Sequence, residues 1–260
     1  MALLQYDDAE AEALEANYLG RDVTAQRLDT LKRLAIRPGE HVLDIGSGPG
    51  FLATEISDQT GPTGRVLGVD ISEAMVRRAT DRNESPWLSY SLGDATAIPV
   101  GDSTFDVVVS TQVAEYMTDL SAFCAEIARV LRPGGRALIL TTDWDSVAWY
   151  SEHPDRMARI MRAQTTSVAH SDVPRKLAPL LRGAGLIVKQ VSCYQIINLN
   201  RSPGSYSAAA VAFTTGIVRG LGTLSEGEIE AWAAEQDALE ARGEYFFSLG
   251  RYIFEVGKPA

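Results

Sequence analysis

Three glycines at alternate positions interrupt the stretch VLDIGSGPGF, which covers residues 42–51. Gly46, Gly48 and Gly50 follow an apolar run that contains Asp44. Glycine lets a backbone approach a ligand closely, and a loop between a buried strand and a helix lies at the carboxyl edge of a parallel sheet, where α/β folds bind ligands. The stretch therefore predicts a nucleotide-type site, but the glycines alone do not select the cofactor.

The spacing excludes two phosphate-binding loops. A triphosphate loop, GxxxxGK[ST], needs Lys and then Ser or Thr after its last glycine, but Phe51 and Leu52 follow Gly50. A dinucleotide loop, GxGxxG, needs a glycine where this sequence has Phe51. Asp44 could order the loop amides or meet a cationic amino group through water. The pattern favours a cofactor that has an amino-acid end and no phosphates.

Two further acids stand at the ends of later apolar runs. Asp70 ends the run RVLGVD, and a carboxylate there can accept hydrogen bonds from both hydroxyls of a ribose, as in NAD or an adenosyl cofactor. Asp94 follows the third run, where its side chain can accept from an adenine amino group. The alternative for Asp94 is that it only caps a turn.

The elements that would position these residues alternate between apolar runs and amphipathic stretches, which is typical of a parallel sheet covered by helices. Their near-continuous apolar character suits strands that are buried on both faces. The predicted strands are 41–46, 65–71, 88–93, 105–111 and 136–142, and the helices between them are 51–59, 72–82 and 118–131. We also expect one or two helices over 8–35, helices over 153–164 and 173–185, and strands over 186–200 and 244–259.

Residues 203–243 carry no strand pattern and contain an amphipathic stretch, so we interpret them as a helical insertion that forms a cap on the sheet. We expect a single domain over 1–260. Its parts are an N-terminal helical lid (1–36), a cofactor-binding core (37–145), helices near the acceptor pocket (146–185) and C-terminal strands with the insertion (186–260).

Composition and charge limit the kinds of partner that this protein is expected to bind. The net charge of -10 leaves no basic surplus to meet nucleic acid or an anionic membrane surface, so we expect neither partner. Cys124 and Cys193 have no CxxC spacing, which indicates two buried thiols and no disulfide framework or metal site. The acidic N-terminus lacks a signal-peptide pattern, and no apolar run is long enough to span a membrane. We expect a cytoplasmic protein.

Four blocks together resemble the class I S-adenosylmethionine-dependent methyltransferases, in the subgroup similar to ubiquinone/menaquinone and sterol methyltransferases. They are VLDIGSGPG, GVDISEAMVRRA, GDATAIPVGDSTFDVVVSTQVAEYM and VLRPGGRALI, in order and with the family's spacing over residues 35–142. The resemblance implies an α/β fold with a Rossmann-like, mostly parallel sheet of seven strands, helices on both faces and a last strand that is antiparallel. FFSLGRYIFEVGKP would supply this last strand.

The resemblance also implies the cofactor site. The glycine loop and the residues after the fourth strand would surround the methionine moiety, and the acids after the second and third strands would hold the ribose and adenine. Met75 could equally belong to the core. Tyr18, Gln26 and Arg27 would close the site as a lid. The residues assigned to the cofactor are Asp44, Gly46, Ser47, Gly48, Gly50, Asp70, Ile71, Met75, Gly93, Asp94, Ala95, Thr111, Gln112, Tyr18 and Arg27.

Acidic, aromatic and histidine side chains after the fifth strand are candidates for the acceptor site. His153 and Asp143 are the predicted catalytic residues, with the alternative that His153 only starts a helix. His170 is a weaker candidate for a base, and His41 is structural. The predicted pocket residues are Tyr116, Trp144, Trp149, Tyr150 and Tyr206, with Asp145 in the same cluster and Phe213, Trp232 and Tyr245 nearby, all of which could instead be core or surface residues.

The chemistry that follows is methyl transfer from S-adenosylmethionine to a small organic acceptor with an O, N or C nucleophile, in secondary metabolism or quinone-like chemistry. Ser110–Val113 reads STQV, which differs from the [DNS]PP[YF] motif of enzymes that methylate planar amide or adenine nitrogens. The alternative is a protein of this fold that binds S-adenosylmethionine or S-adenosylhomocysteine and catalyses a different reaction, such as a cyclisation. The complete set of cofactor motifs disfavours a non-enzymatic binding protein.

Overall fold

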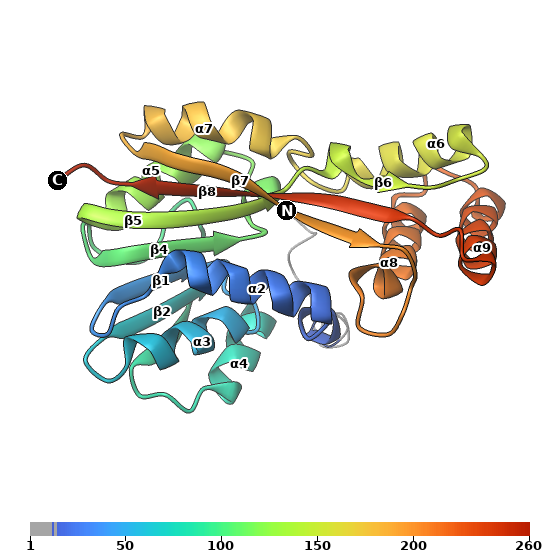
Figure 1. The fold of residues 1–260 in the computed structure, drawn as a ribbon. Helices are drawn as coiled ribbons and strands as arrows, with labels where there is room; N and C mark the ends of the chain where they lie inside the picture. The colour runs from blue at the N-terminus through green and yellow to red at the C-terminus, as the bar shows by residue number, and fades with distance from the viewer. Residues whose placement is uncertain (1–11, 13–14) are drawn as a thin grey trace.

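The computed structural model describes residue 12 and residues 15–260. They form one sheet in the order β3-β2-β1-β4-β5-β8-β6, with β7 paired to β8 along most of its length (Figure 1). The strands are β1 (His41–Ile45), β2 (Arg65–Asp70), β3 (Leu88–Leu92), β4 (Phe105–Thr111), β5 (Leu131–Thr142), β6 (Ala148–Trp149), β7 (Ile187–Asn198) and β8 (Phe247–Gly257).

The strand directions confirm the predicted fold class. Strands β1 to β5 pair in parallel, whereas β8 is antiparallel to β5 and to β7. The two-residue strand β6 pairs with the start of β8 and was not predicted, because two residues are too short to show a periodic pattern. The carboxyl ends of β1, β2, β4 and β5 therefore lie at one edge of the sheet, where the glycine loop also begins.

Helices cover both faces of the sheet and build the cap (Figure 1). Residues of α2 and α3 pack on one face, and residues of α5 and α7 pack on the other. Two helices, α8 and α9, occupy the range of the predicted insertion, and they lie with α6 at one end of the sheet (Figure 1). The helices are α2 (Arg21–Leu34), α3 (Phe51–Thr60), α4 (Glu73–Arg82), α5 (Leu120–Val130), α6 (Pro154–Thr165), α7 (Val173–Gly183), α8 (Tyr206–Leu221) and α9 (Glu226–Arg242), with 3-10 turns η2 (Ala114–Tyr116) and η3 (Trp144–Ser146).

Local sequence explains where several helices begin. Ser72, Asp119 and Ser205 each precede a helix, and each side chain accepts a hydrogen bond from a backbone N–H of the first turn. In the predicted N-terminal helical region, residues 12 and 15–18 are helical and α2 follows, while 8–11, 13 and 14 lie outside the described residues.

Three corrections concern single elements. Strand β5 begins at Leu131, earlier than predicted, because Arg132 to Gly135 continue the strand after α5. Strand β3 lies at the edge of the sheet and is partly exposed, so it is not buried on both faces. Cys124 is buried as expected, but Cys193 on β7 is exposed.

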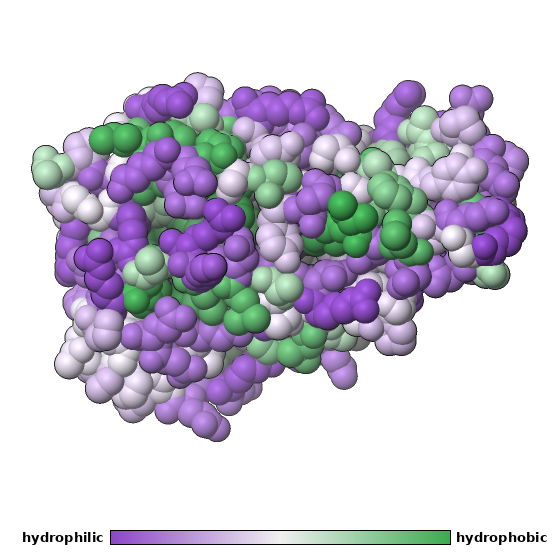
Figure 2. Space-filling view, viewed as in Figure 1, coloured by the Kyte–Doolittle hydropathy of each residue, from purple (hydrophilic) through white to green (hydrophobic). Residues whose placement is uncertain are grey.

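The face of the protein drawn in Figure 2 carries many hydrophilic side chains. On the face shown in Figure 2, hydrophilic side chains separate the apolar ones into patches. Within residues 12 and 15–260, no helix is both long and apolar enough to cross a membrane.

Candidate cofactor and acceptor site

The glycine loop joins the end of β1 to the start of α3. Its three glycines have left-handed backbone angles, with φ of 70° at Gly46, 51° at Gly48 and 87° at Gly50. Gly50 is the residue that precedes the first turn of α3. The N–H groups of Gly46 and Ser47 donate to the carbonyl of Val69 at 2.7 and 3.1 Å, which ties the loop to the end of β2. The loop is therefore a fixed cradle of backbone at the ligand edge of the sheet.

Asp70 holds the middle of this loop. Its Oδ2 accepts from the N–H of Gly48 at 2.8 Å, and its Oδ1 accepts from the N–H of Ser72 at 2.9 Å. Burial raises the pKa of Asp70, and these two hydrogen bonds oppose the increase. An ionised carboxylate offers about four acceptor positions. A further backbone N–H, that of Ile71, also contacts Asp70, so at least one acceptor position of the carboxylate stays available for a ligand hydroxyl, which is compatible with the predicted contact to a ribose.

Asp44 is a buried acid without a counter-charge in contact. It is 1% exposed, and its Oδ2 has no hydrogen-bond partner among the described residues. Burial raises the pKa of Asp44 to about 7, and the nearby charge of Asp70 adds to the increase. The hydroxyl of Ser47 is likewise buried without a partner. Buried polar atoms are normally hydrogen-bonded, so these two atoms point to a polar ligand with a cationic or donor group.

Two residues of the predicted lid, Tyr18 and Arg27, lie close to the glycine loop or to residues that contact it. The hydroxyl of Tyr18 lies 3.7 Å from the position that a Cβ on Gly48 would take, and its ring centroid lies 6.2 Å from that of Phe51. Arg27 donates to the carbonyl of Tyr18 at 3.0 Å and to Glu55 at 2.9 Å. Tyr18 and Arg27 therefore lie at the loop. Gln26, the third predicted lid residue, instead contacts Arg251 on β8.

The residues after β3 show the turn that was one of the two alternatives for Asp94, and its contact with an adenine stays a prediction. Its Oδ1 accepts from the N–H and the hydroxyl of Thr96 at 2.8 and 2.7 Å, so it does cap a turn. The side chain is exposed, and these bonds occupy only one of its oxygens. Gly93 is needed here because a Cβ would lie 2.8 Å from Val69 Cγ1. Ala95 is half-buried against the core.

Ile71 and Met75 differ in their surroundings. Ile71 is 38% exposed at the ligand edge, whereas Met75 is only 2% exposed in the first turn of α4. The burial of Met75 favours the core interpretation, and its contact with an adenine stays a prediction.

The end of β4 carries a strained residue. Gln112 has a φ of 60°, which is uncommon for a residue with a side chain and occurs frequently at functional sites. Its Oε1 accepts from the hydroxyl of Thr142 at 2.6 Å, while its Nε2 is buried and finds no partner in the part of the chain that the structure describes. Thr111, the last residue of β4, is half-buried. The structure thus places Gln112 at the ligand edge with a free donor, which fits its predicted role beside the methionine moiety.

Comparison with known proteins shows which family the core of the chain resembles. Residues 43–139, which include the glycine loop, Asp70 and Gln112, match the family described as "Methyltransferase domain". The chain is 40% identical over 116 residues to the ubiquinone/menaquinone biosynthesis C-methyltransferase of Cupriavidus taiwanensis, which covers 44% of this chain and 48% of that protein. Residues 43–139 therefore form a methyltransferase domain, and this part of the chain is similar to the class I S-adenosylmethionine-dependent methyltransferases. S-adenosylmethionine is the cofactor of this family.

Solved structures share the fold at low sequence identity. Phosphoethanolamine N-methyltransferase 2 of Haemonchus contortus, solved with S-adenosyl-L-methionine, has a TM-score of 0.62 at 20% identity and covers 98% of this chain and 58% of its own. The [4+2]-cyclase SpnF has a TM-score of 0.59 at 21% identity and covers 92% and 81%. The chain spans about half the length of the curated relatives it matches.

Glu115 is a further buried acid, which the sequence analysis did not single out. It is fully buried in η2, and its Oε2 accepts from the hydroxyl of Thr141 at 2.7 Å. Burial raises the pKa of Glu115, and its Oε1 has no partner within the described residues. The available signal was an acid inside the otherwise apolar stretch that follows β4.

Neither predicted catalytic residue, Asp143 or His153, contacts the glycine loop within the described residues. Asp143 is 4% exposed, and Arg175 Nη2 donates to both of its oxygens at 3.0 Å. His153 is exposed and directly precedes Pro154 at the start of α6, as the alternative interpretation expected. Its catalytic role stays a prediction that no contact supports.

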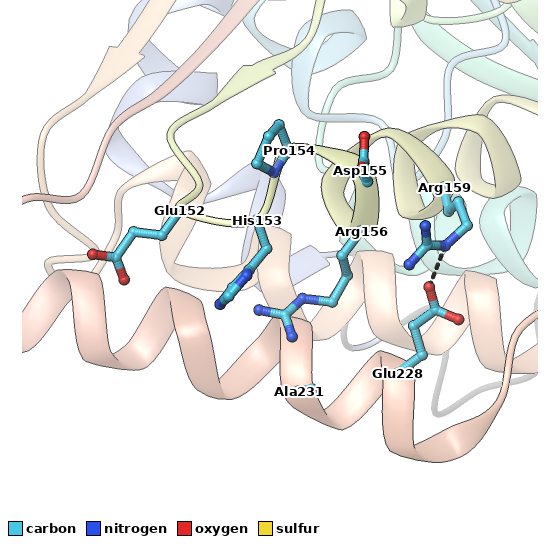
Figure 3. A pocket seen from close by; sticks show the side chains of 8 residues that line it. All are labelled: Glu152, His153, Pro154, Asp155, Arg156, Arg159, Glu228 and Ala231. Atoms are coloured by element: carbon cyan, nitrogen blue, oxygen red, sulfur yellow. Dashed lines mark hydrogen bonds and ion pairs between the residues drawn. The ribbon is translucent and has the colours of Figure 1, made fainter.

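His153 borders a surface hollow between α6 and α9. The hollow has a volume of about 510 Å³, and charged side chains dominate its lining. In Figure 3 the imidazole of His153 lies beside the guanidinium of Arg156, and Arg159 bonds to Glu228 across the hollow. The lining residues are Glu152, His153, Pro154, Asp155, Arg156, Arg159, Glu228 and Ala231, none of which belongs to the glycine loop.

Two of the predicted pocket aromatics, Trp149 and Tyr206, lie in the core of the cap. Trp149 packs against Trp232, Tyr245 and Phe247, with ring centroids 5.2, 6.1 and 4.8 Å apart. Tyr206 stacks on Phe247 at 5.6 Å. Trp232 and Tyr245 are buried, which favours the core interpretation for both. The cluster joins the cap helices to the sheet.

The remaining candidates lie on several different elements. Tyr150 and Phe213 are each 46% exposed. The indole Nε1 of Trp144 is buried without a partner among the described residues. Tyr116 is half-buried in η2, Asp145 is exposed in η3, the N–H of His170 donates to the carbonyl of Glu115, and His41 begins β1 at the opposite edge, as expected.

Proposed function

We propose that this protein transfers a methyl group from S-adenosylmethionine to a small organic acceptor in the biosynthesis of secondary metabolites. The observation that carries the proposal is the buried, unpaired Asp44 beside a fixed glycine loop and Asp70. A cationic amino group near Asp44 would stabilise its charged form, and the hydroxyls of a ribose suit the open positions of Asp70. Similarity to this family and the geometry of these groups support the same cofactor.

The residues present fit this cofactor, part by part. The backbone of Gly46, Ser47 and Gly48 would hold the methionine end together with Gln112, Asp70 would bind the ribose, and Asp94 with Ala95 would bind the adenine. The cofactor supplies a methyl group already activated on a sulfonium, so the protein has to orient the acceptor and exclude water. Tyr18 and Arg27 would keep water out by covering the loop.

Calorimetric titration with S-adenosylmethionine and S-adenosylhomocysteine tests the proposal first. A screen of candidate acceptors follows, in which a mass increase of one methyl group identifies the product. Absence of binding overturns the whole proposal. Binding without transfer to any acceptor favours the alternative, a non-methylating reaction such as a cyclisation on the same fold.

A further inference from the structure

Arg251 is a buried cation on β8. It is 5% exposed, and its Nε is buried without a hydrogen-bond partner. Its Nη1 donates to Oε1 of Gln26 on α2, and its guanidinium carbon lies 5.0 Å from the ring centroid of Tyr206 at the start of α8. A neutral amide oxygen and a ring face thus orient this guanidinium, and neither carries a negative charge.

No carboxylate forms an ion pair with Arg251 among residues 12 and 15–260. Arg33, on the same interface between α2 and β8, shows the contrast, because its Nη1 lies 3.1 Å from Glu255. Asp22, one turn before Gln26, accepts instead from Asn198 and from the N–H of Tyr206. The buried acid Glu115 interacts electrostatically with Arg251, but it forms no ion pair with it, and Arg251 Nε has no partner among the described residues. A buried charge is costly unless it is paired, so a counter-charge in contact with Nε would have to come from outside the described residues.

The position of Arg251 relates it to the cofactor site. Thr142 lies directly opposite Arg251 in the β5–β8 ladder, and the hydroxyl of Thr142 bonds to the strained Gln112. On α2, Gln26 contacts Arg251. Its neighbour Arg27 contacts Tyr18, which lies at the glycine loop. One helix therefore covers both Arg251 and the region where the methionine end would lie.

We propose that Arg251 binds an anionic group, a carboxylate or a phosphate, of the molecule that accepts the methyl group. This inference rests on the proposed methyltransferase function and adds the chemical class of the acceptor to it. A guanidinium presents a planar fork of donors that matches carboxylate and phosphate oxygens, and Nε is the donor still available in this fork. Gln26 and Tyr206 hold the fork in place.

Binding of matched acid and neutral probes tests the inference. Benzoate with benzamide, hexanoate with hexanamide, and phenyl phosphate with phenol are titrated into protein saturated with S-adenosylhomocysteine. The wild type should bind at least one anion about 10-fold to 100-fold more tightly than its neutral match, as expected for a charge-assisted hydrogen bond. Arg251→Met should abolish this preference, and Arg33→Met, which breaks an ion pair on the same interface, should preserve it.

A stability measurement excludes a purely structural role. A buried charge without a contacting partner is costly to the ligand-free folded protein, so an apolar side chain in its place should not destabilise the fold. The melting temperature of the ligand-free double variant Gln26→Leu/Arg251→Met should therefore equal or exceed that of the wild type, and Arg33→Met should lower it. A wild type that shows no anion preference, or an Arg251→Met variant that keeps one, overturns the inference. Failure of the wild type to bind S-adenosylhomocysteine contradicts the methyltransferase proposal itself, so the two failures are distinguishable.

Discussion

Gly46 packs against Val113 with no room for a side chain, because a Cβ on Gly46 would lie 2.1 Å from Val113 Cγ2. Gly46→Ala should therefore displace the loop or Val113 and weaken cofactor binding. Overpacking costs about 1–3 kcal/mol, and the left-handed backbone at this position adds about 1–2 kcal/mol for a residue with a Cβ. Urea unfolding and titration with S-adenosylhomocysteine would measure both effects.

Gly243 provides the matched control for this substitution. Its φ of 70° equals that of Gly46 and its backbone is left-handed, but no described atom lies within 4 Å of its Cβ position. Gly243→Ala should thus show the backbone cost alone and leave cofactor affinity unchanged. Addition of Val113→Ala to Gly46→Ala should recover part of the lost stability. Equal losses in Gly46→Ala and Gly243→Ala would contradict the close packing.

Asp70 links the glycine loop to the proposed ribose site, so its removal should affect both. Asp70→Ala deletes the acceptor of the Gly48 and Ser72 N–H groups as well as the charged acceptor for a ligand. We expect cofactor affinity to fall by about 2–3 kcal/mol, the scale of charge-assisted hydrogen bonds. Calorimetry measures the change, with Asp102→Ala as a control that removes an exposed acid outside the site. An unchanged dissociation constant in Asp70→Ala would remove Asp70 from the site.

The sequence predicted the elements whose pattern is local. The apolar runs located the parallel strands, and Ser72 located the start of α4. The glycine spacing likewise located the loop, since each feature depends on neighbouring residues. Contacts between distant segments were not predictable in this way, and the clearest example is Arg251, whose partner Gln26 lies 225 positions away.

Burial explains the other misses at the candidate site. Trp149 and Tyr206 are aromatic residues near the ligand edge, and sequence alone did not distinguish a pocket wall from the core of the cap. His153 was selected for its chemistry, but its position depends on how α6 packs against α9. Glu115 was passed over because an acid usually lies at the surface, whereas here it is fully buried.

Asp44 should make the stability of the protein depend on pH. The unfolded chain loses this proton near its ordinary pKa of 3.8, whereas the folded protein keeps it until about 7. Between these values unfolding releases a proton, so the free energy of unfolding falls as pH rises, by at most about 1.4 kcal/mol per pH unit. Urea unfolding at pH 5, 6, 7 and 8 should show this slope in the wild type and a smaller one in Asp44→Asn. Parallel pH curves for the two proteins would contradict the raised pKa.

His153 is the test of whether the enzyme uses a histidine base. Its exposed position at the start of α6, in a hollow lined by charged residues of α6 and α9, gives it no contact with the glycine loop or Gln112. His153→Gln should therefore leave kcat/KM within about twofold of the wild type, because general base catalysis contributes about 10²–10⁴-fold. Methyl transfer to the acceptor found by the mass screen provides the assay, and Glu228→Gln is the control from the same hollow. A loss of about 100-fold or more confined to His153→Gln would instead establish the catalytic role and require α6 to move toward the sheet edge during the reaction.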